Sequence, residues 1–115
     1  MKCCLTVRPP WAQAIFILGK GVENRSWYTN HRGLLYIHAG VRTDPAGLLL
    51  VPADRLTDPL LAARGVILGS VELVDCVRDA RSRWAAKGAW HWVLENPRLL
   101  RHPIPAVGRL GFWRF

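Results

Sequence analysis

Short strand-like runs, each closed by glycine or proline, recur from one end of this chain to the other. Cys3–Val7 stops at two prolines, Gly33–Ala39 stops at a glycine, and Gly65–Val77 is rich in β-branched residues. Such runs of apolar and alternating residues are typical of β-strands. The remaining expected strands are Gly21–Trp27, Trp90–Leu94 and Gly111–Phe115. Because most of the connections are short, the pattern favours a small barrel of mixed strands over a parallel sheet with helical crossovers.

Helical segments are expected early in the chain and in its middle. An apolar stripe at helical spacing runs from Trp11 to Leu18, and Gly19 follows where a helix commonly ends in a left-handed residue. Within Thr43–Arg64, two aspartates each precede a proline, which predicts capped helical pieces. A further short helix is predicted over Ala80–Lys87.

Two features of the second half of the chain carry specific expectations. Period-two alternation puts Glu72 on the same face of its strand as Leu68 and Val74, where a carboxylate is out of place. Asn96-Pro97 is expected to end the preceding strand, because proline cannot donate to a strand ladder. Arg98–Pro105 is then expected to be irregular.

Length and charge bound the organisation and the partners of the chain. The 115 residues, half of them apolar and 21% charged, are expected to form one domain over residues 1–115. Sixteen Lys and Arg against eight Asp and Glu leave a net charge of +8, which favours polyanionic partners, nucleic acid first. The alternative is that thirteen scattered arginines reflect composition alone.

The cysteines give no sign of a metal, a cofactor or a disulfide framework. Cys3, Cys4 and Cys76 are odd in number and form no CxxC pair. No signal peptide is recognised, and no apolar run approaches the roughly 20 residues that a membrane crossing needs. We therefore expect a cytoplasmic protein with no membrane partner, no cofactor and no metal site; the oligomeric state stays open.

Three charged residues gather where the first helix is expected to meet the next strand. Strand periodicity puts Glu23, Arg25 and Trp27 on one face, with same-face neighbours about 6 to 7 Å apart, and Lys20 approaches from the turn before it. Such a trio can bind a phosphate or a carbonyl oxygen. The alternative is an ion-pair network that fastens the helix to the sheet.

Lys20-x-x-Glu23-x-Arg25 resembles the K-x-x-E-x-R core of the ASCH domains, a branch of the PUA-like superfamily. The segments that carry the rest of the resemblance, in the family's order, are Leu5–Pro10, Glu23–Trp27, Arg32–Ala39, Gly69–Val77 and Trp92–Arg98. One departure is that the family's glycine two places before the lysine is Leu18 here, with Gly19 adjacent. The resemblance implies an α+β fold, a small PUA-like β-barrel flanked by short helices, with a cleft for RNA or a nucleotide.

The resemblance leaves catalysis open. Some ASCH proteins are similar to amidohydrolases that deacetylate N4-acetylcytidine with a lysine, a threonine and a glutamate. Lys20 matches the lysine and Glu72 is matched to the glutamate, whereas Glu23 replaces the threonine. Lys20, Glu72 and Glu23 are thus the catalytic candidates, with Glu72 as general base and Lys20 polarising the oxygen. The alternative for Glu72 is a salt bridge to Lys20 or Arg25.

Further candidate ligand contacts surround the motif. Trp27 shares a face with Glu23 and Arg25 and is the tryptophan best placed to stack on an unpaired base. Most of the other tryptophans are expected in the core, among them Trp11, Trp90 and Trp92. Arg8 and His38 lie at expected strand ends and are candidates to face the same cleft. The alternatives are a solvated cation for Arg8 and a hydrogen-bonded structural role for His38.

Three functions remain open at this point. The first is a module that binds RNA, another single-stranded nucleic acid or a nucleotide through Lys20, Glu23, Arg25, Trp27, Arg8 and His38. The second is a hydrolase of the same family, an amidohydrolase or a ribonuclease. The third is a domain whose basic face docks on an acidic protein.

Overall fold

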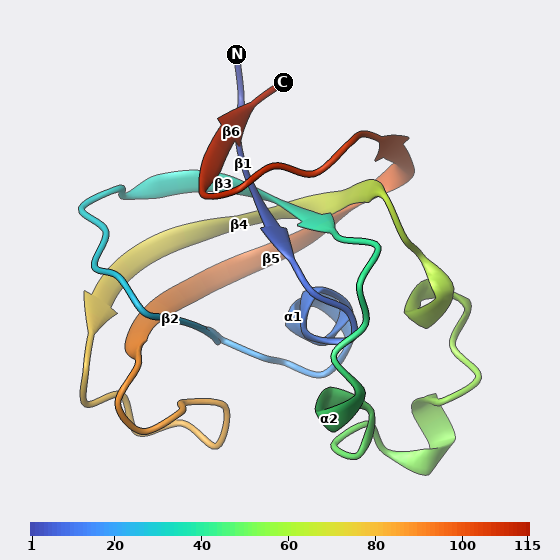
Figure 1. Cartoon of the computed structure of the whole chain (residues 1–115), viewed down its shortest axis with the longest axis horizontal. Coiled ribbons are helices and arrows are strands. Elements are labelled where there is room, and N and C mark those ends of the chain that lie inside the picture. The colour runs from blue at the N-terminus through green and yellow to red at the C-terminus, as the bar shows by residue number, and fades with distance from the viewer.

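The computed structural model describes residues 1–115, and it consists of one curled six-stranded sheet with short helices around it (Figure 1). The strands are β1 (Cys3–Val7), β2 (Val22–Arg25), β3 (Gly33–Ala39), β4 (Val66–Val77), β5 (Trp90–Pro105) and β6 (Phe112–Arg114). Their order is β2-β5-β4-β3-β1-β6, with β1 and β3 parallel and all other neighbours antiparallel. The sheet is therefore a half-barrel with β2 and β6 as its edges, and the expected α+β fold with a mixed-strand barrel is confirmed.

Four short helical segments connect the strands. Helix α1 (Trp11–Ile17) lies between β1 and β2, while α2 (Pro45–Leu48), η1 (Ala53–Arg55) and η2 (Pro59–Ala62) follow β3. Asp44 and Asp58 each cap one of these pieces by accepting a backbone N–H, with proline at the start, as their sequence predicts. None of the helices has the length and apolar character to cross a membrane.

The core fills the concave side of the sheet against α1. Leu5, Ile15, Leu35 and Trp92 are at most 1% exposed and belong to one cluster of fourteen buried residues. Gly19 ends α1 with a φ of +66°, which a residue without a Cβ adopts at no steric cost, so the expected cap is confirmed. The chain can therefore turn sharply from the helix into β2.

Strand β5 is longer than the sequence predicts, and the expected end at Asn96-Pro97 is wrong. Its sixteen residues pass through this step into Arg98–Pro105, which is strand and not irregular. Asn96 takes a φ of 51° where the β4–β5 register shifts, between the pairs Glu72↔Glu95 and Ser70↔Arg98. A β-bulge tolerates proline because a bulged residue need not donate to the ladder.

The predicted helix over Ala80–Lys87 is also wrong. This segment is a turn-rich loop whose backbone is bound by side chains from elsewhere. Asn24 accepts from the Ala86 N–H and donates to the Trp84 carbonyl, both at 2.8 Å, and His91 contacts two further backbone groups of the loop. These distant partners satisfy backbone groups that a helix would otherwise pair within itself.

A bulge in β4 at Leu68 places Glu72 on the outer face of the sheet, contrary to expectation. There β4 carries one extra residue relative to β3, between the pairs His38↔Ile67 and Ile37↔Gly69, so that after Leu68 the next residues of the main core are Val71 and Leu73. One extra residue exchanges the two faces of a strand. Glu72 is consequently exposed opposite exposed Leu34.

Candidate functional site

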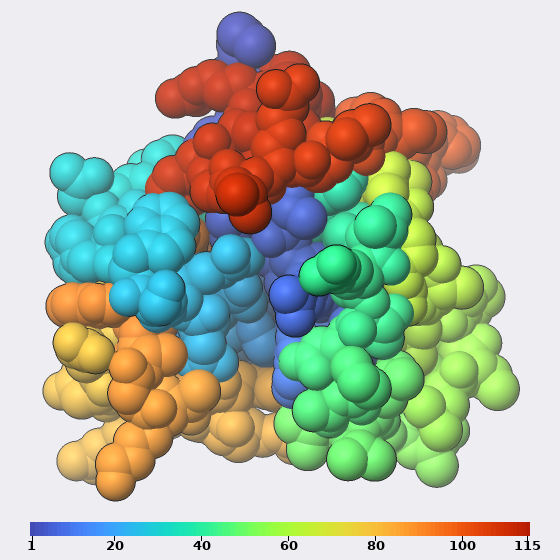
Figure 2. Space-filling model, in the orientation of Figure 1, coloured from blue at the N-terminus to red at the C-terminus, as the bar shows by residue number.

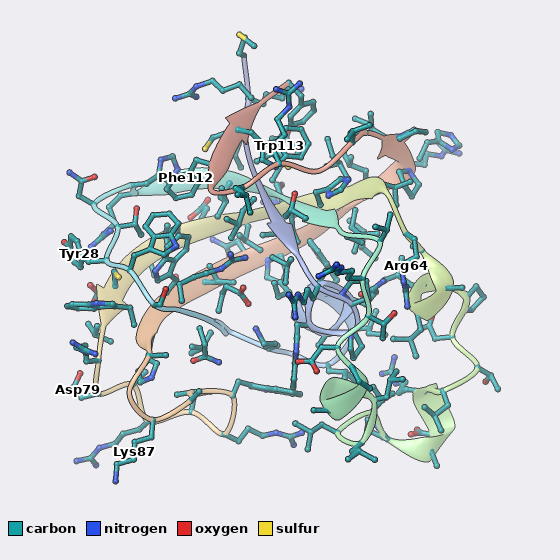
Figure 3. All side chains as sticks on the ribbon, viewed as in Figure 1. Tyr28, Arg64, Asp79, Lys87, Phe112 and Trp113 are labelled. Atoms are coloured by element: carbon teal, nitrogen blue, oxygen red, sulfur yellow. The ribbon has the colours of Figure 1, made fainter.

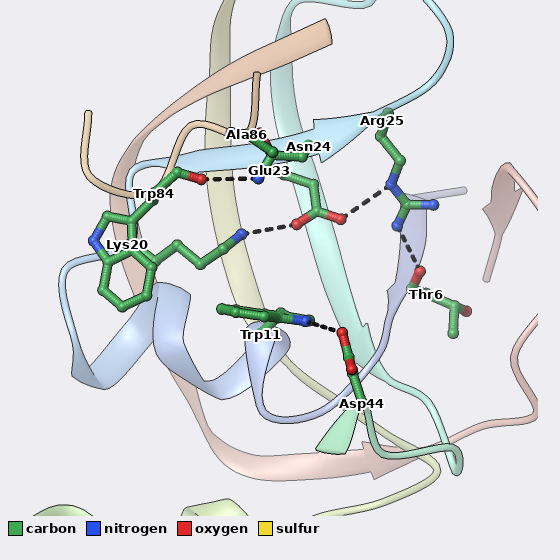
Figure 4. A network of polar contacts seen from close by, with 9 residues as sticks. All are labelled: Thr6, Trp11, Lys20, Glu23, Asn24, Arg25, Asp44, Trp84 and Ala86. Atoms are coloured by element: carbon green, nitrogen blue, oxygen red, sulfur yellow. Dashed lines mark hydrogen bonds and ion pairs between the residues drawn. The ribbon is translucent and has the colours of Figure 1, made fainter. Parts of the chain in front are cut away.

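The turn after α1 and the first residues of β2 bring the three charged side chains of the motif together (Figure 4). The Lys20 backbone N–H donates to the Ala14 carbonyl at 3.1 Å, which folds the chain back beneath the helix. Lys20 Nζ lies 2.9 Å from Glu23 Oε1, and Arg25 Nε lies 3.0 Å from Glu23 Oε2. Lys20, Glu23 and Arg25, hereafter the ion-pair chain, therefore meet as expected, but none of the three lines the large hollow described below.

Two members of the ion-pair chain are closed to solvent. The side chains of Lys20 and Glu23 are 2% and 9% exposed, whereas that of Arg25 is 22% exposed. Lys20 Nζ also lies 5.9 Å from the centre of the Trp11 ring, and Trp84 meets Trp11 edge-on. Because both oxygens of Glu23 hold a cation, its carboxylate is not free to serve as a base. Arg25 is the member that a ligand can reach.

Arg25 links the two sides of the half-barrel. Strand β6 covers the edge of β1 only as far as Leu5, opposite Phe112. Beyond that point Arg25 Nη2 donates to the Thr6 carbonyl at 2.8 Å. The ion-pair chain therefore joins the end of α1, edge strand β2 and strand β1 across the open side of the sheet.

A hollow of about 830 Å³ begins at Thr6, next to this link. Three exposed arginines line it, Arg8 from the end of β1, Arg42 after β3 and Arg109 after β5. We call it the arginine hollow; Figure 2 shows the surface recessed where the blue, green and red segments meet. Its volume lies within the roughly 300 to 1,000 Å³ of small-molecule sites.

Aliphatic side chains share the edge of the arginine hollow with the cations. Val41, Val107 and Leu110 line it and are 77%, 85% and 100% exposed. These three, the aliphatic rim, stand beside guanidinium groups instead of packing into the core. The site thus offers both apolar surface and positive charge to one ligand.

A hydrogen-bonded histidine forms the floor of the arginine hollow. His38 is 1% exposed, and its Nε2 lies 2.7 Å from the Ala106 carbonyl, which can only accept. Nε2 therefore donates to this carbonyl, while Nδ1 lies 3.2 Å from the Thr6 hydroxyl, which accepts from Trp113 Nε1 at 3.0 Å. This geometry favours the structural alternative for His38, which holds the segment after β5 in place.

A close backbone approach fixes the same segment. A Cβ added to Gly108 would lie 2.9 Å from Thr6 Oγ1 and 3.0 Å from His38 Cε1. Glycine is therefore needed for the loop that carries Arg109 to approach the floor.

Trp27 lies just beyond β2, because that strand ends at Arg25 and not at Trp27 as expected. It is 38% exposed and meets Trp92 and Phe112 edge-on, with ring centres 4.7 and 5.5 Å away. Arg25 also contacts Trp92, its Cζ 6.0 Å from the ring centre. Trp27 and Arg25 therefore both contact the Trp92 ring.

The structure does not bring Glu72 to Lys20. Lys20 lines a small cavity of about 180 Å³ with Val71 and Leu94, whereas Glu72 follows Val71 onto the opposite face and accepts from Asn96 Nδ2 at 3.1 Å. The acid-base pair of Lys20 and Glu72 is therefore not assembled, and Glu72 forms no salt bridge to Lys20 or Arg25.

Sequence reasoning missed Arg42, Arg109 and the aliphatic rim. These residues lie in two connections, one after β3 and one after β5, which come together only in the folded chain. The one available signal is that each combines a glycine, an aliphatic residue and an arginine, as in Gly40-Val41-Arg42 and Gly108-Arg109-Leu110.

The three thiols lie in the core and are not paired with one another. Burial raises the pKa of Cys4 to about 12 and also raises the pKa of Cys3, where Arg114 opposes the effect. Nowhere do three or more His, Cys, Asp or Glu side chains gather as a metal would require.

Comparison with known proteins identifies the family. The family model of the ASCH domain matches residues 5–102, and the chain therefore belongs to the ASCH domain family, as its motif predicts. It is 29% identical over 126 aligned residues to activating signal cointegrator 1 of Mus musculus, and 28% identical to that of Homo sapiens. Each match covers 96% of this chain and 22% of the relative, so the chain spans about a fifth of their length.

Proposed function

We propose that this ASCH domain binds single-stranded nucleic acid in the arginine hollow. The observation that carries the proposal is the juxtaposition of Arg8, Arg42 and Arg109 with the aliphatic rim around one cavity. The guanidinium groups suit phosphate oxygens, and the rim suits the face of an unpaired base. A nucleotide offers both kinds of surface at once.

Charge supports a polyanionic ligand over a neutral one. The chain carries eight positive charges in excess, and no acidic side chain lines the arginine hollow. Arg25 adds a partly exposed guanidinium beside Thr6, at the margin of the same cavity. Contacts between cations and phosphates release counterions, so binding weakens steeply as salt is added.

Trp27 is proposed as a stacking platform for a neighbouring base. Its ring is partly exposed and is held from behind by Trp92 and Phe112, so it is oriented before any ligand arrives. Stacking of an unpaired base on such a ring contributes about 1 to 3 kcal/mol. RNA association is a general property of the ASCH family, and the family match therefore supports RNA as the ligand of the proposed site.

The hydrolase alternative has less support in this geometry. Lys20 is buried, both oxygens of Glu23 are occupied, and Glu72 faces outward. We accordingly expect no deacetylation of N4-acetylcytidine and no cleavage of labelled RNA by the purified protein. Turnover that disappears in Lys20→Ala but not in a matched surface variant would restore the hydrolase assignment.

Two further assignments accompany the proposal. We take residues 1–115 to act as a single domain, and we place it in a reducing compartment such as the cytoplasm because its three thiols are buried and unpaired. The competing assignment is an acidic protein partner for the basic face. The relatives' name, activating signal cointegrator 1, is consistent with a protein partner.

A titration with fluorescent single-stranded RNA at several salt concentrations tests the proposed site. We compare wild type with Arg42→Gln/Arg109→Gln and with the control Arg55→Gln/Arg98→Gln, whose exposed arginines lie outside the hollow. The hollow variant should bind more weakly and lower the salt slope by about 1.4, at about 0.7 per lost phosphate contact. Absence of binding at low salt, or an equal loss in the control, would refute the site.

A further inference from the structure

We propose that the loop between β4 and β5 is a second contact surface for the same single strand. This β4–β5 loop, residues 78–89, carries four cations and one acid, an excess of three positive charges. The cations are Arg78, Arg81, Arg83 and Lys87, all exposed, and the acid is Asp79. The inference rests on the function proposed above and adds a second place where the ligand is held.

The cations of the β4–β5 loop are not neutralised within the molecule. All three salt bridges of the protein lie elsewhere, two in the ion-pair chain and one between Arg32 and Asp75. Like charges placed so close together repel one another in the free protein. A phosphate backbone running past the loop would remove that repulsion.

The loop is anchored to β2 and β5 although it contains no helix or strand. Asn24 holds it through the Trp84 carbonyl and the Ala86 N–H. His91 accepts from the Ala80 N–H at 3.2 Å and donates to the Ala86 carbonyl at 2.7 Å. A surface ordered in advance loses less conformational entropy on binding than a mobile one.

Two of the arginines lie over tryptophan rings. Arg83 Cζ is 4.5 Å from the centre of the Trp84 ring, and Arg78 Cζ is 4.7 Å from that of Trp90. Each ring supports one side of a guanidinium group and leaves its other side toward solvent, since both arginines are exposed. Unpaired bases stack on such supported guanidinium planes, whereas paired bases present only their edges. The loop therefore suits a single strand better than a duplex.

The loop and the arginine hollow lie apart, so only a long ligand can reach both. In Figure 1 the loop projects at one end of the half-barrel, away from the segment after β5, and Figure 3 shows Lys87 pointing outward from it. The molecule measures 34 × 33 Å in this view. A stacked strand advances about 3.4 Å per nucleotide, so four nucleotides span only about 10 Å.

Ligand length therefore separates the two surfaces experimentally. Wild type is titrated with a four-nucleotide and a twenty-nucleotide oligouridylate, and with the matching DNA oligomers, which decide between RNA and DNA as the preferred strand. The loop variant is Arg81→Gln/Arg83→Gln/Lys87→Gln, which spares Arg78 because that side chain also donates to the Gly88 carbonyl. The control, Arg55→Gln/Arg98→Gln/Arg101→Gln, removes three exposed charges elsewhere.

The loop variant should bind the twenty-nucleotide strand about tenfold more weakly, with a salt slope smaller by about 2, and bind the four-nucleotide strand as wild type does. An unchanged affinity for the long strand, or an equal loss in the control, overturns the inference while the proposed function stands. Failure of wild type to bind either length refutes the proposed function itself. A loss that appears only with an acidic protein ligand assigns the loop to a protein partner instead.

A conservative variant tests the stacking part of the inference. Arg83→Lys keeps the charge but removes the planar group that lies over Trp84. Affinity for the long strand should fall about two- to fivefold with the salt slope unchanged. Binding equal to wild type would reduce the role of Arg83 to its charge and overturn the stacking contact.

Discussion

Replacing Glu23 by glutamine should destabilise the fold far more than a surface substitution of the same kind. The change leaves the Lys20 ammonium, 2% exposed, without a counter-ion and removes the anion that orients Arg25 toward Thr6. Removing one partner of a buried ion pair costs about 3 to 5 kcal/mol. The amide oxygen can still accept one hydrogen bond, so we expect the lower end, about 3 kcal/mol.

That loss corresponds to a large thermal shift for a chain of this size. An unfolding entropy of about 2.1 cal/mol/K per residue gives about 0.24 kcal/mol/K for 115 residues, so Tm should fall by about 12 °C. Urea unfolding followed by tryptophan fluorescence measures the free energy directly. Glu95→Gln, on an exposed strand position, is the matched control and should change stability by less than about 0.5 kcal/mol.

A double-mutant cycle shows whether the loss comes from the unpaired charge. Lys20→Met keeps most of the side chain but removes the ammonium, so Lys20→Met/Glu23→Gln leaves no buried cation without a partner. The free energy of unfolding lost in the double variant should be smaller, by about 1 to 3 kcal/mol, than the sum of the losses in the two single variants. A cost below about 1 kcal/mol for Glu23→Gln, or strictly additive losses, would refute our view of the ion-pair chain as a buried clamp.

Four shorter predictions cover the rest of the molecule. Gly69→Ala should lower the free energy of unfolding by more than about 2 kcal/mol in urea titrations, because its Cβ would clash with the Arg98 carbonyl oxygen; a near-neutral result would contradict this packing. Asn24→Ala should speed amide hydrogen exchange in the β4–β5 loop, since two hydrogen bonds are lost, and unchanged protection would argue against the loop's anchoring. Because the pKa of Cys4 is raised to about 12 in the folded protein, the thiol ionises at lower pH in the unfolded chain, and the free energy of unfolding should fall between about pH 9 and 12. Cys4→Ala should lose less stability than wild type over that range in urea unfolding. Equal losses in the two proteins would count against the raised pKa. Glu72→Gln should leave both stability and RNA affinity within error of wild type, which a binding titration checks.

The charged motif could be predicted from sequence because its geometry is local. Lys20, Glu23 and Arg25 lie within six residues, and a helix end followed by a strand fixes where their side chains point. The α+β half-barrel could be predicted for a similar reason, since each strand contains a local apolar run that its own sequence reveals. What could not be predicted depends on pairing between distant segments.

The face of the sheet on which a strand residue lies is the clearest example, because it depends on how the strand pairs with its neighbours. The bulge at Leu68 exchanges the faces of β4, so Glu72 turns outward although the residues of the strand alternate regularly in sequence. The β4–β5 loop departs from the predicted helix because Asn24 and His91, remote in sequence, take its backbone hydrogen bonds. The arginine hollow likewise forms from connections after β3 and β5, which carry no periodic pattern.

Under the proposed function, ligand contacts the arginine hollow and Arg25, while Lys20 remains buried. Titrating a four-nucleotide RNA into ¹⁵N-labelled protein tests this most directly, with Arg Nε–H and Lys Nζ signals recorded alongside the amides. We predict shifts at the Gly40 and Gly108 amides and at Arg25 Nε, with Lys20 Nζ unmoved. Shifts centred on Lys20, or none at the two glycines, would contradict the account.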